Sequence, residues 1–72
     1  MKYIVVELQT MADGSVANLV TQHDNRDQAE SKFHTVLAAA AVSALPEHSA
    51  VLLTSTGITL DSRCYEHGTG GA

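Results

Sequence analysis

The amino-acid sequence predicts an α+β fold with the element order ββαββ, in which one helix packs on one face of a four-stranded antiparallel sheet. Runs of β-branched residues flank a single segment with helical spacing, and an Asp-Gly turn separates the first two runs. A chain of 72 residues has the length of one domain. We therefore expect residues 1–67 to form a single domain and the glycine-rich residues 68–72 to be a flexible tail.

The first two strands are expected to form a hairpin. In residues 3–9 (YIVVELQ), Ile4, Val6 and Leu8 share one face and alternate with the residues of the other face. The Ala-Asp-Gly-Ser sequence at 12–15 is a strong hairpin signal, so residues 16–23 are predicted as the returning strand. This second strand is the more polar of the two, which is typical of a sheet edge.

The helix is predicted from about Gln28 to Leu45. Asp27 and Glu30 have the spacing of a capping box at its start, and Pro46 ends it. One helical face is apolar and is expected to lie on the sheet. Its members are Ala29, Phe33, Val36, Leu37, Ala40 and Ala44.

Residues 50–55 and 58–67 are predicted as the third and fourth strands, joined by a turn at Thr56-Gly57. A right-handed crossover through the helix leaves room for strand one between strands two and three. This predicts the strand order 2-1-3-4, which places the two most apolar strands in the centre. An order with strand four in the centre is the alternative.

The charge and the cysteine content argue against several classes of partner. The net charge is −4, and the only fixed cations are Lys2, Arg26, Lys32 and Arg63, so nucleic acids are repelled rather than attracted. The longest apolar run, 36–42, is too short to cross a membrane. The single cysteine, Cys64, and the lack of a signal-peptide pattern predict a cytoplasmic protein. The four histidines are expected to be ordinary polar surface residues.

The alanine-rich end of the helix predicts self-association. Ala38, Val42 and Leu45 lie nearly opposite the core stripe, so the second half of the helix is apolar almost all round. A helix on a small sheet needs no second apolar face in a monomer. We expect a homo-oligomer, in the simplest case a two-fold dimer, joined through these three residues. The alternative is that the alanines are present only for their high helix propensity.

A ligand site is expected on the sheet face turned away from the helix. If Ile58, Leu60 and Cys64 point to the core, the alternate residues of strand four point outward. The predicted ligand-binding residues are Tyr3, Arg63, Tyr65 and His67. Their rings and cations suit a flat ring that carries an anion. The alternative is a solvated sheet face that tyrosines shield.

Metal and enzyme sites have weaker support. In Cys64–His67 (CYEH), residues three apart face opposite ways on a strand, and no second Cys-His pair completes four zinc ligands. Cys64 is expected to be a buried, inert thiol. We therefore predict no metal, no cofactor and no catalytic residues, and a small domain without a deep pocket is not expected to be an enzyme.

Three segments carry a resemblance to known sequences: KYIVVELQTMADG (2–14), AESKFHTVLAAAAVSALPEH (29–48) and CYEH (64–67). Here the chain resembles small uncharacterised open reading frames of phages and prophages of gut Firmicutes. The resemblance implies a setting in the cytoplasm of a bacterial host, and it assigns no functional residue. Small phage accessory proteins commonly act by occupying a host protein or a host signalling molecule.

Together these observations lead to one functional expectation and two alternatives. The expectation is a non-enzymatic accessory binding protein, a homo-oligomer that sequesters a nucleotide-like host defence signal on the sheet face or at a seam between subunits. The first alternative is an interaction module that inhibits a host protein through an exposed edge strand or the acidic surface. The second is a minor structural component of the virion.

Overall fold

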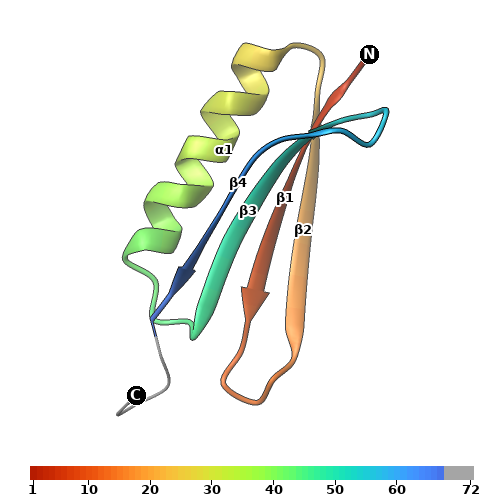
Figure 1. Cartoon of the computed structure of the whole chain (residues 1–72). Coiled ribbons are helices and arrows are strands. Elements are labelled where there is room, and N and C mark those ends of the chain that lie inside the picture. The colour runs from red at the N-terminus through yellow and green to blue at the C-terminus, as the bar shows by residue number, and fades with distance from the viewer. Residues whose placement is uncertain (68–72) are drawn as a thin grey trace.

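The computed structural model describes residues 1–67 and confirms the ββαββ order (Figure 1). Strands β1 (Tyr3–Thr10), β2 (Val16–His23), β3 (Glu47–Thr54) and β4 (Thr59–Glu66) form one antiparallel sheet in the order β2-β1-β3-β4. Helix α1 (Arg26–Ala41) lies along one face of this sheet. The predicted tail at 68–72 lies outside the described residues.

Two glycine turns close the hairpins. Gly14 has a φ of 90° and donates its N–H to the carbonyl of Met11, while the Asp13 carboxylate accepts from the Ser15 amide at 2.9 Å. Gly57 has a φ of 92° in the turn between β3 and β4. Both positions favour glycine because side chains with a Cβ rarely adopt a positive φ.

The helix begins earlier than predicted, and a different residue caps it. The Asn25 side chain, not Asp27, accepts the amide of Gln28 at 2.9 Å, and the extended backbone of Asn25 suits a cap. Glu30 accepts from Arg26 Nε at 3.0 Å instead of reaching back in a capping box. The prediction missed that Asn25 and Gln28 have the same capping spacing three residues upstream of the expected start.

The helix also ends earlier than predicted. It stops at Ala41, because the amides of Val42 and Ser43 turn back to the carbonyls of Ala39 and Ala40. Ser43 then accepts the amide of Leu45 through its side chain. Pro46 disfavours helical backbone only at Leu45, directly before it, so it does not account for the helix end at Ala41. Strand β3 begins at Glu47, three residues before the predicted start.

The core lies between α1 and the central strands β1 and β3. The helix contributes Ala29, Phe33, Val36 and Ala40, and the sheet contributes Val5, Ala50 and Leu52. Val5 is only 1% exposed, whereas its neighbours Ile4 and Val6 are half-buried on the other side of the sheet. We call the side turned away from α1 the open face.

The start of β4 differs from the prediction. Ile58 is 61% exposed and lies outside the strand, and Cys64 is exposed rather than part of the core. Only Leu60 packs against the core as expected. A register irregularity between Leu52 and Leu53 shifts the alternation of β4 relative to β3. The simple alternation from Ile58 to Cys64 therefore does not hold.

Candidate functional site

The predicted ligand-binding residues of β4 face the helix, not solvent on the far side. Arg63 lies opposite Ala50 and Tyr65 lies opposite His48, and both partners on β3 are buried under α1. The prediction of a site on the sheet face away from the helix is therefore wrong. The helix covers the sheet face that carries Val5 and Leu52. The register irregularity near Leu52 shifts the alternation of β4, so Arg63 and Tyr65 lie on this same face.

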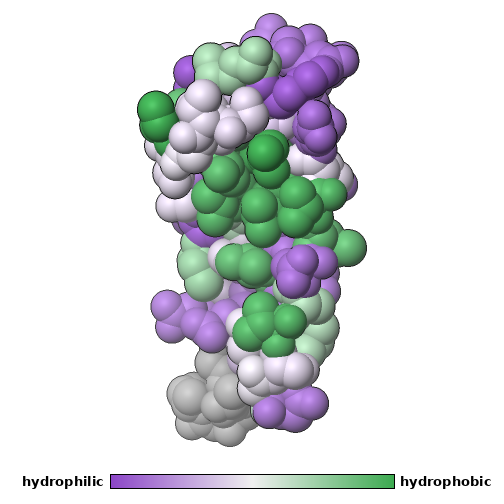
Figure 2. Space-filling view, turned by 90° about the vertical axis from the view of Figure 1, so that its right-hand side faces the viewer, coloured by the Kyte–Doolittle hydropathy of each residue, from purple (hydrophilic) through white to green (hydrophobic). Residues whose placement is uncertain are grey.

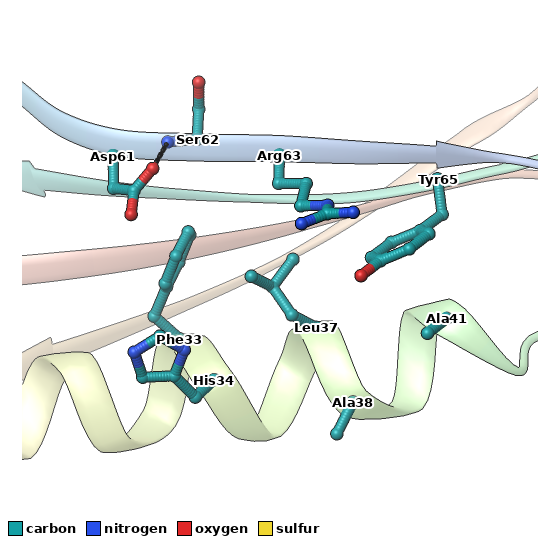
Figure 3. Close-up of a pocket in the computed structure, with 9 residues that line it drawn as sticks. All are labelled: Phe33, His34, Leu37, Ala38, Ala41, Asp61, Ser62, Arg63 and Tyr65. Atoms are coloured by element: carbon teal, nitrogen blue, oxygen red, sulfur yellow. Dashed lines mark hydrogen bonds between the residues drawn. The ribbon is translucent and has the colours of Figure 1, made fainter.

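A groove of about 520 Å³ separates α1 from the edge strand β4. Figure 3 shows Arg63 and Tyr65 pointing from β4 toward the helix, and Phe33 and Leu37 pointing from α1 toward the strand. We call this the Arg63 groove, and its lining residues are Phe33, His34, Leu37, Ala38, Ala41, Asp61, Ser62, Arg63 and Tyr65. The groove exists because α1 lies chiefly over the central strands and leaves β4 less covered.

A row of cationic and aromatic groups runs along β4 beside the groove. The Arg63 guanidinium carbon lies 4.7 Å from the centre of the Tyr65 ring. The rings of Tyr65 and His67 are stacked at 6.3 Å with an angle of 7° between their planes. His67 Nε2 contacts the carbonyl oxygen of Ala40 at 2.8 Å, which ties the end of β4 to the helix. Alternation along the strand places these three residues on the same side of the sheet.

The fourth predicted ligand residue, Tyr3, does not join them. Tyr3 packs against the core and lies opposite Thr54, whereas Tyr65 lies opposite His48. Six residues along β3 correspond to about 20 Å. Tyr3 is therefore at the other end of the sheet, and no single small ligand contacts both tyrosines of one chain.

The alanine run of the helix has a mixed role. Ala40 is fully buried against the core, while Ala38 and Ala41 line the groove and Ala39 is exposed. Larger side chains at Ala38 or Ala41 would occupy the space between helix and strand. Small residues at these two positions therefore help to keep the groove open.

The residues expected to form a helix seam are not aligned on one helix. Ala38 belongs to the groove, Val42 is the C-cap and is 86% exposed, and Leu45 lies in the loop after α1. An interface through all three residues stays a prediction, but it no longer has a continuous helical face to support it.

A buried polar pair was missed by the sequence analysis. His48 is 5% exposed, in contrast to the expectation of four surface histidines, and its Nε2 lies 2.6 Å from Glu7 Oε2. Burial raises the pKa of Glu7, but hydrogen bonds from His48 and Gln9 outweigh it, so the net pKa is lowered. His48 Nδ1 is buried without a partner among residues 1–67. The pairing was not visible in the sequence because it joins positions 41 apart.

A second cluster lies at one end of the open face. Potential ligand atoms of Glu47, Cys64 and Glu66 lie within 4.8 Å of one another, and all three residues are exposed. Desolvation and the two carboxylates raise the pKa of the Cys64 thiol, which disfavours the nucleophilic thiolate. His67 points to the helix side, so Cys64 and His67 diverge as predicted. Three exposed groups fall short of the four ligands of a structural zinc site.

The Arg63 groove combines one guanidinium with aromatic and aliphatic walls. Among residues 1–67, Arg63 takes part in no ion pair, whereas Lys2 pairs with Asp24 and Arg26 with Glu30. A guanidinium that stacks on a ring and keeps its donors free suits recognition of an anion beside a flat group. Asp61 also lines the groove and offsets the charge of Arg63, which disfavours a multiply charged anion.

Comparisons with known proteins leave the chemistry of the groove as the guide to function. No protein-family model matches the chain, and the comparisons with curated proteins and with solved structures gave no significant match. Within the described residues, α1 is too short and too polar to cross a bilayer.

Proposed function

We propose that this chain is a non-enzymatic binding protein that holds a small anionic ligand with a flat ring in the Arg63 groove. The observation that supports it is the Arg63 guanidinium, stacked 4.7 Å from the Tyr65 ring centre and free of ion pairs among residues 1–67. Leu37 supplies an apolar wall opposite, and Phe33, which is only 1% exposed, lies behind it. Small-molecule sites commonly pair such walls with a few polar groups.

The ligand class is a nucleoside phosphate that carries a single charge, such as a cyclic phosphodiester. Because Asp61 offsets the charge of Arg63, a multiply charged anion is disfavoured, and the ring of a base can lie against the apolar wall at Leu37. A signalling nucleotide of a bacterial host belongs to this class. In the phage setting that the sequence resemblance implies, the protein sequesters such a signal in the host cytoplasm.

The test is calorimetric titration with singly charged cyclic nucleoside monophosphates as probes. Arg63→Gln is expected to lower the affinity about 10-fold or more, because hydrogen bonds to charged groups contribute about 1.5–3 kcal/mol. Arg26→Gln is the matched control, since it removes the same charge from an exposed helix position that pairs with Glu30. Equal losses in the two variants, or no binding to the unmodified chain, would count against the proposal.

A second candidate function is inhibition of a host protein by strand addition at β4. Strand β4 is a sheet edge of eight residues, and the groove runs beside it. An extended peptide commonly pairs with such an edge while its side chains enter the adjacent groove. This function predicts a protein that copurifies from host lysate with the Arg63→Gln variant as well as with the unmodified chain.

A further inference from the structure

The open face of the sheet carries an apolar surface that α1 does not cover. Register pairing places Val6 between Val20 and Val51, and Ile4 beside Leu53, on this face. Val16 and Val20 are 57% and 60% exposed. Figure 2 shows hydrophobic side chains spread across the middle of this face. We call the surface the valine face, and its residues are Ile4, Val6, Leu8, Val16, Val20, Val51 and Leu53.

Charged residues border the valine face only at the two ends of the strands. Lys2 and Asp24 form an ion pair at the end where β1 begins. Glu47 and Glu66 lie opposite each other at the other end. Between them, the polar residues of the open face are uncharged or, like Cys64, weakly polar. The end with the Lys2–Asp24 ion pair therefore has no net charge, and the end with Glu47 and Glu66 is acidic.

The area of the open face is near the minimum for a specific pair of sheets. Strands of eight residues are about 27 Å long, and four strands are about 19 Å wide. One face then offers about 500 Å², and two facing copies bury about 1,000 Å², which is near the lower limit of specific interfaces. A domain of this size also gains from such burial because its own core is small.

We propose that a second copy of this chain covers the valine face, so that two sheets pack face to face in a two-fold dimer. Sheets in such pairs pack about 10 Å apart and keep their strands within about 30° of each other. The interface is self-complementary, because the middle row of valines of one copy meets the same row of the other. The helices and the Arg63 grooves then lie on the two outer sides.

The charges at the strand ends select the direction of the two-fold axis. With the axis across the strands, the neutral Lys2–Asp24 end of each copy approaches the acidic end formed by the partner's Glu47 and the partner's Glu66. With the axis along the strands, four carboxylates would meet at one end and repel one another. We therefore place the axis across the strands. This dimer is independent of the ligand proposed for the groove.

The experiment compares two neighbouring residues of β2 that face opposite ways. Val20 is 60% exposed on the valine face, and Leu19 is 55% exposed on the helix side. Light scattering of the unmodified chain at about 100 µM, a concentration suited to a small interface, should give twice the chain mass of 7.6 kDa. Val20→Glu should give a folded monomer, because the axis brings the two introduced charges together. Leu19→Glu should remain a dimer.

Other outcomes overturn the proposal. A monomeric unmodified chain, or equal disruption by Leu19→Glu, would show that the valine face is not the interface. Loss of the dimer in Val42→Glu alone would place the interface at the end of α1 instead. Circular dichroism checks that each variant is folded. If Val20→Glu is unfolded, the isosteric Val20→Thr variant replaces it and must raise the dissociation constant of the dimer several-fold. Lys2→Glu must also weaken the dimer at low salt, or the stated axis is wrong.

Discussion

Single residues decide what each side of the sheet can do. Arg63 gives the groove its preference for an anion, because two of the other fixed cations, Lys2 and Arg26, are already paired with carboxylates. Tyr65 holds the guanidinium from one side, and His67 fixes the end of the strand on the helix. The overall charge of −4 opposes anion binding at long range, so binding depends on these short contacts.

The Glu7 carboxylate makes the stability depend on pH. Its side chain is 14% exposed and bonded to His48, and its pKa in the fold lies below the ordinary value. A group with a lowered pKa stabilises the fold above its unfolded pKa of about 4.3, and this contribution is lost as the pH falls through the folded value. We expect Glu7→Gln to lower the free energy of unfolding at pH 7 by about 1–3 kcal/mol.

Urea denaturation at several pH values measures this effect. Between pH 7 and pH 3, the free energy of unfolding should fall less in Glu7→Gln than in the unmodified chain. Asp13 and Asp24, whose pKa values are also lowered, remain in both proteins and contribute equally. Parallel pH curves for the two proteins would show that Glu7 has no such role.

At the scale of elements, the cap of α1 is the feature most open to test. The Asn25→Ala variant should lose about 1 kcal/mol of unfolding free energy, since Asn25 satisfies the amide of Gln28. Asp27→Ala should lose only a few tenths, because Asp27 contributes through the helix dipole. Thermal melting of both variants provides the comparison. If Asp27→Ala lost more unfolding free energy than Asn25→Ala, the result would support the capping box of Asp27 and Glu30 predicted from the sequence.

The sequence predicted the elements and the strand order because those depend on local patterns. Hairpin turns, helix spacing and a right-handed crossover all act over short segments of chain. The side of the sheet that the helix covers depends instead on long-range packing. Both faces of β1 are apolar, so nothing in the order of Ile4, Val5 and Val6 distinguishes the covered face.

The candidate site was predicted in part for the same reason. Arg63 and Tyr65 alternate on β4 and His67 follows directly after it, so their association follows from alternation alone. Tyr3 was added on the assumption of a shared face, but the antiparallel register places it at the far end of the sheet. The pairing of Glu7 with His48 depends on the register of β1 and β3, which local patterns do not determine.

At the scale of the whole molecule, the two sides of the sheet are proposed to have separate tasks. The helix side carries the groove for an anionic ring, and the open side carries the valine face for a second copy. This arrangement leaves both grooves of the dimer exposed on opposite outer surfaces. Ligand binding and self-association are therefore expected to be disrupted by different substitutions.

The most direct test is a two-dimensional NMR titration of the isotope-labelled chain with adenosine 3′,5′-cyclic monophosphate, a singly charged probe. If the Arg63 groove is the ligand site, the largest shift changes will appear at Arg63, Tyr65 and the facing residues Phe33 and Leu37, and the Arg63→Gln variant will lose them. Absence of shifts at millimolar probe, or shifts confined to the valine face, would contradict the proposed function.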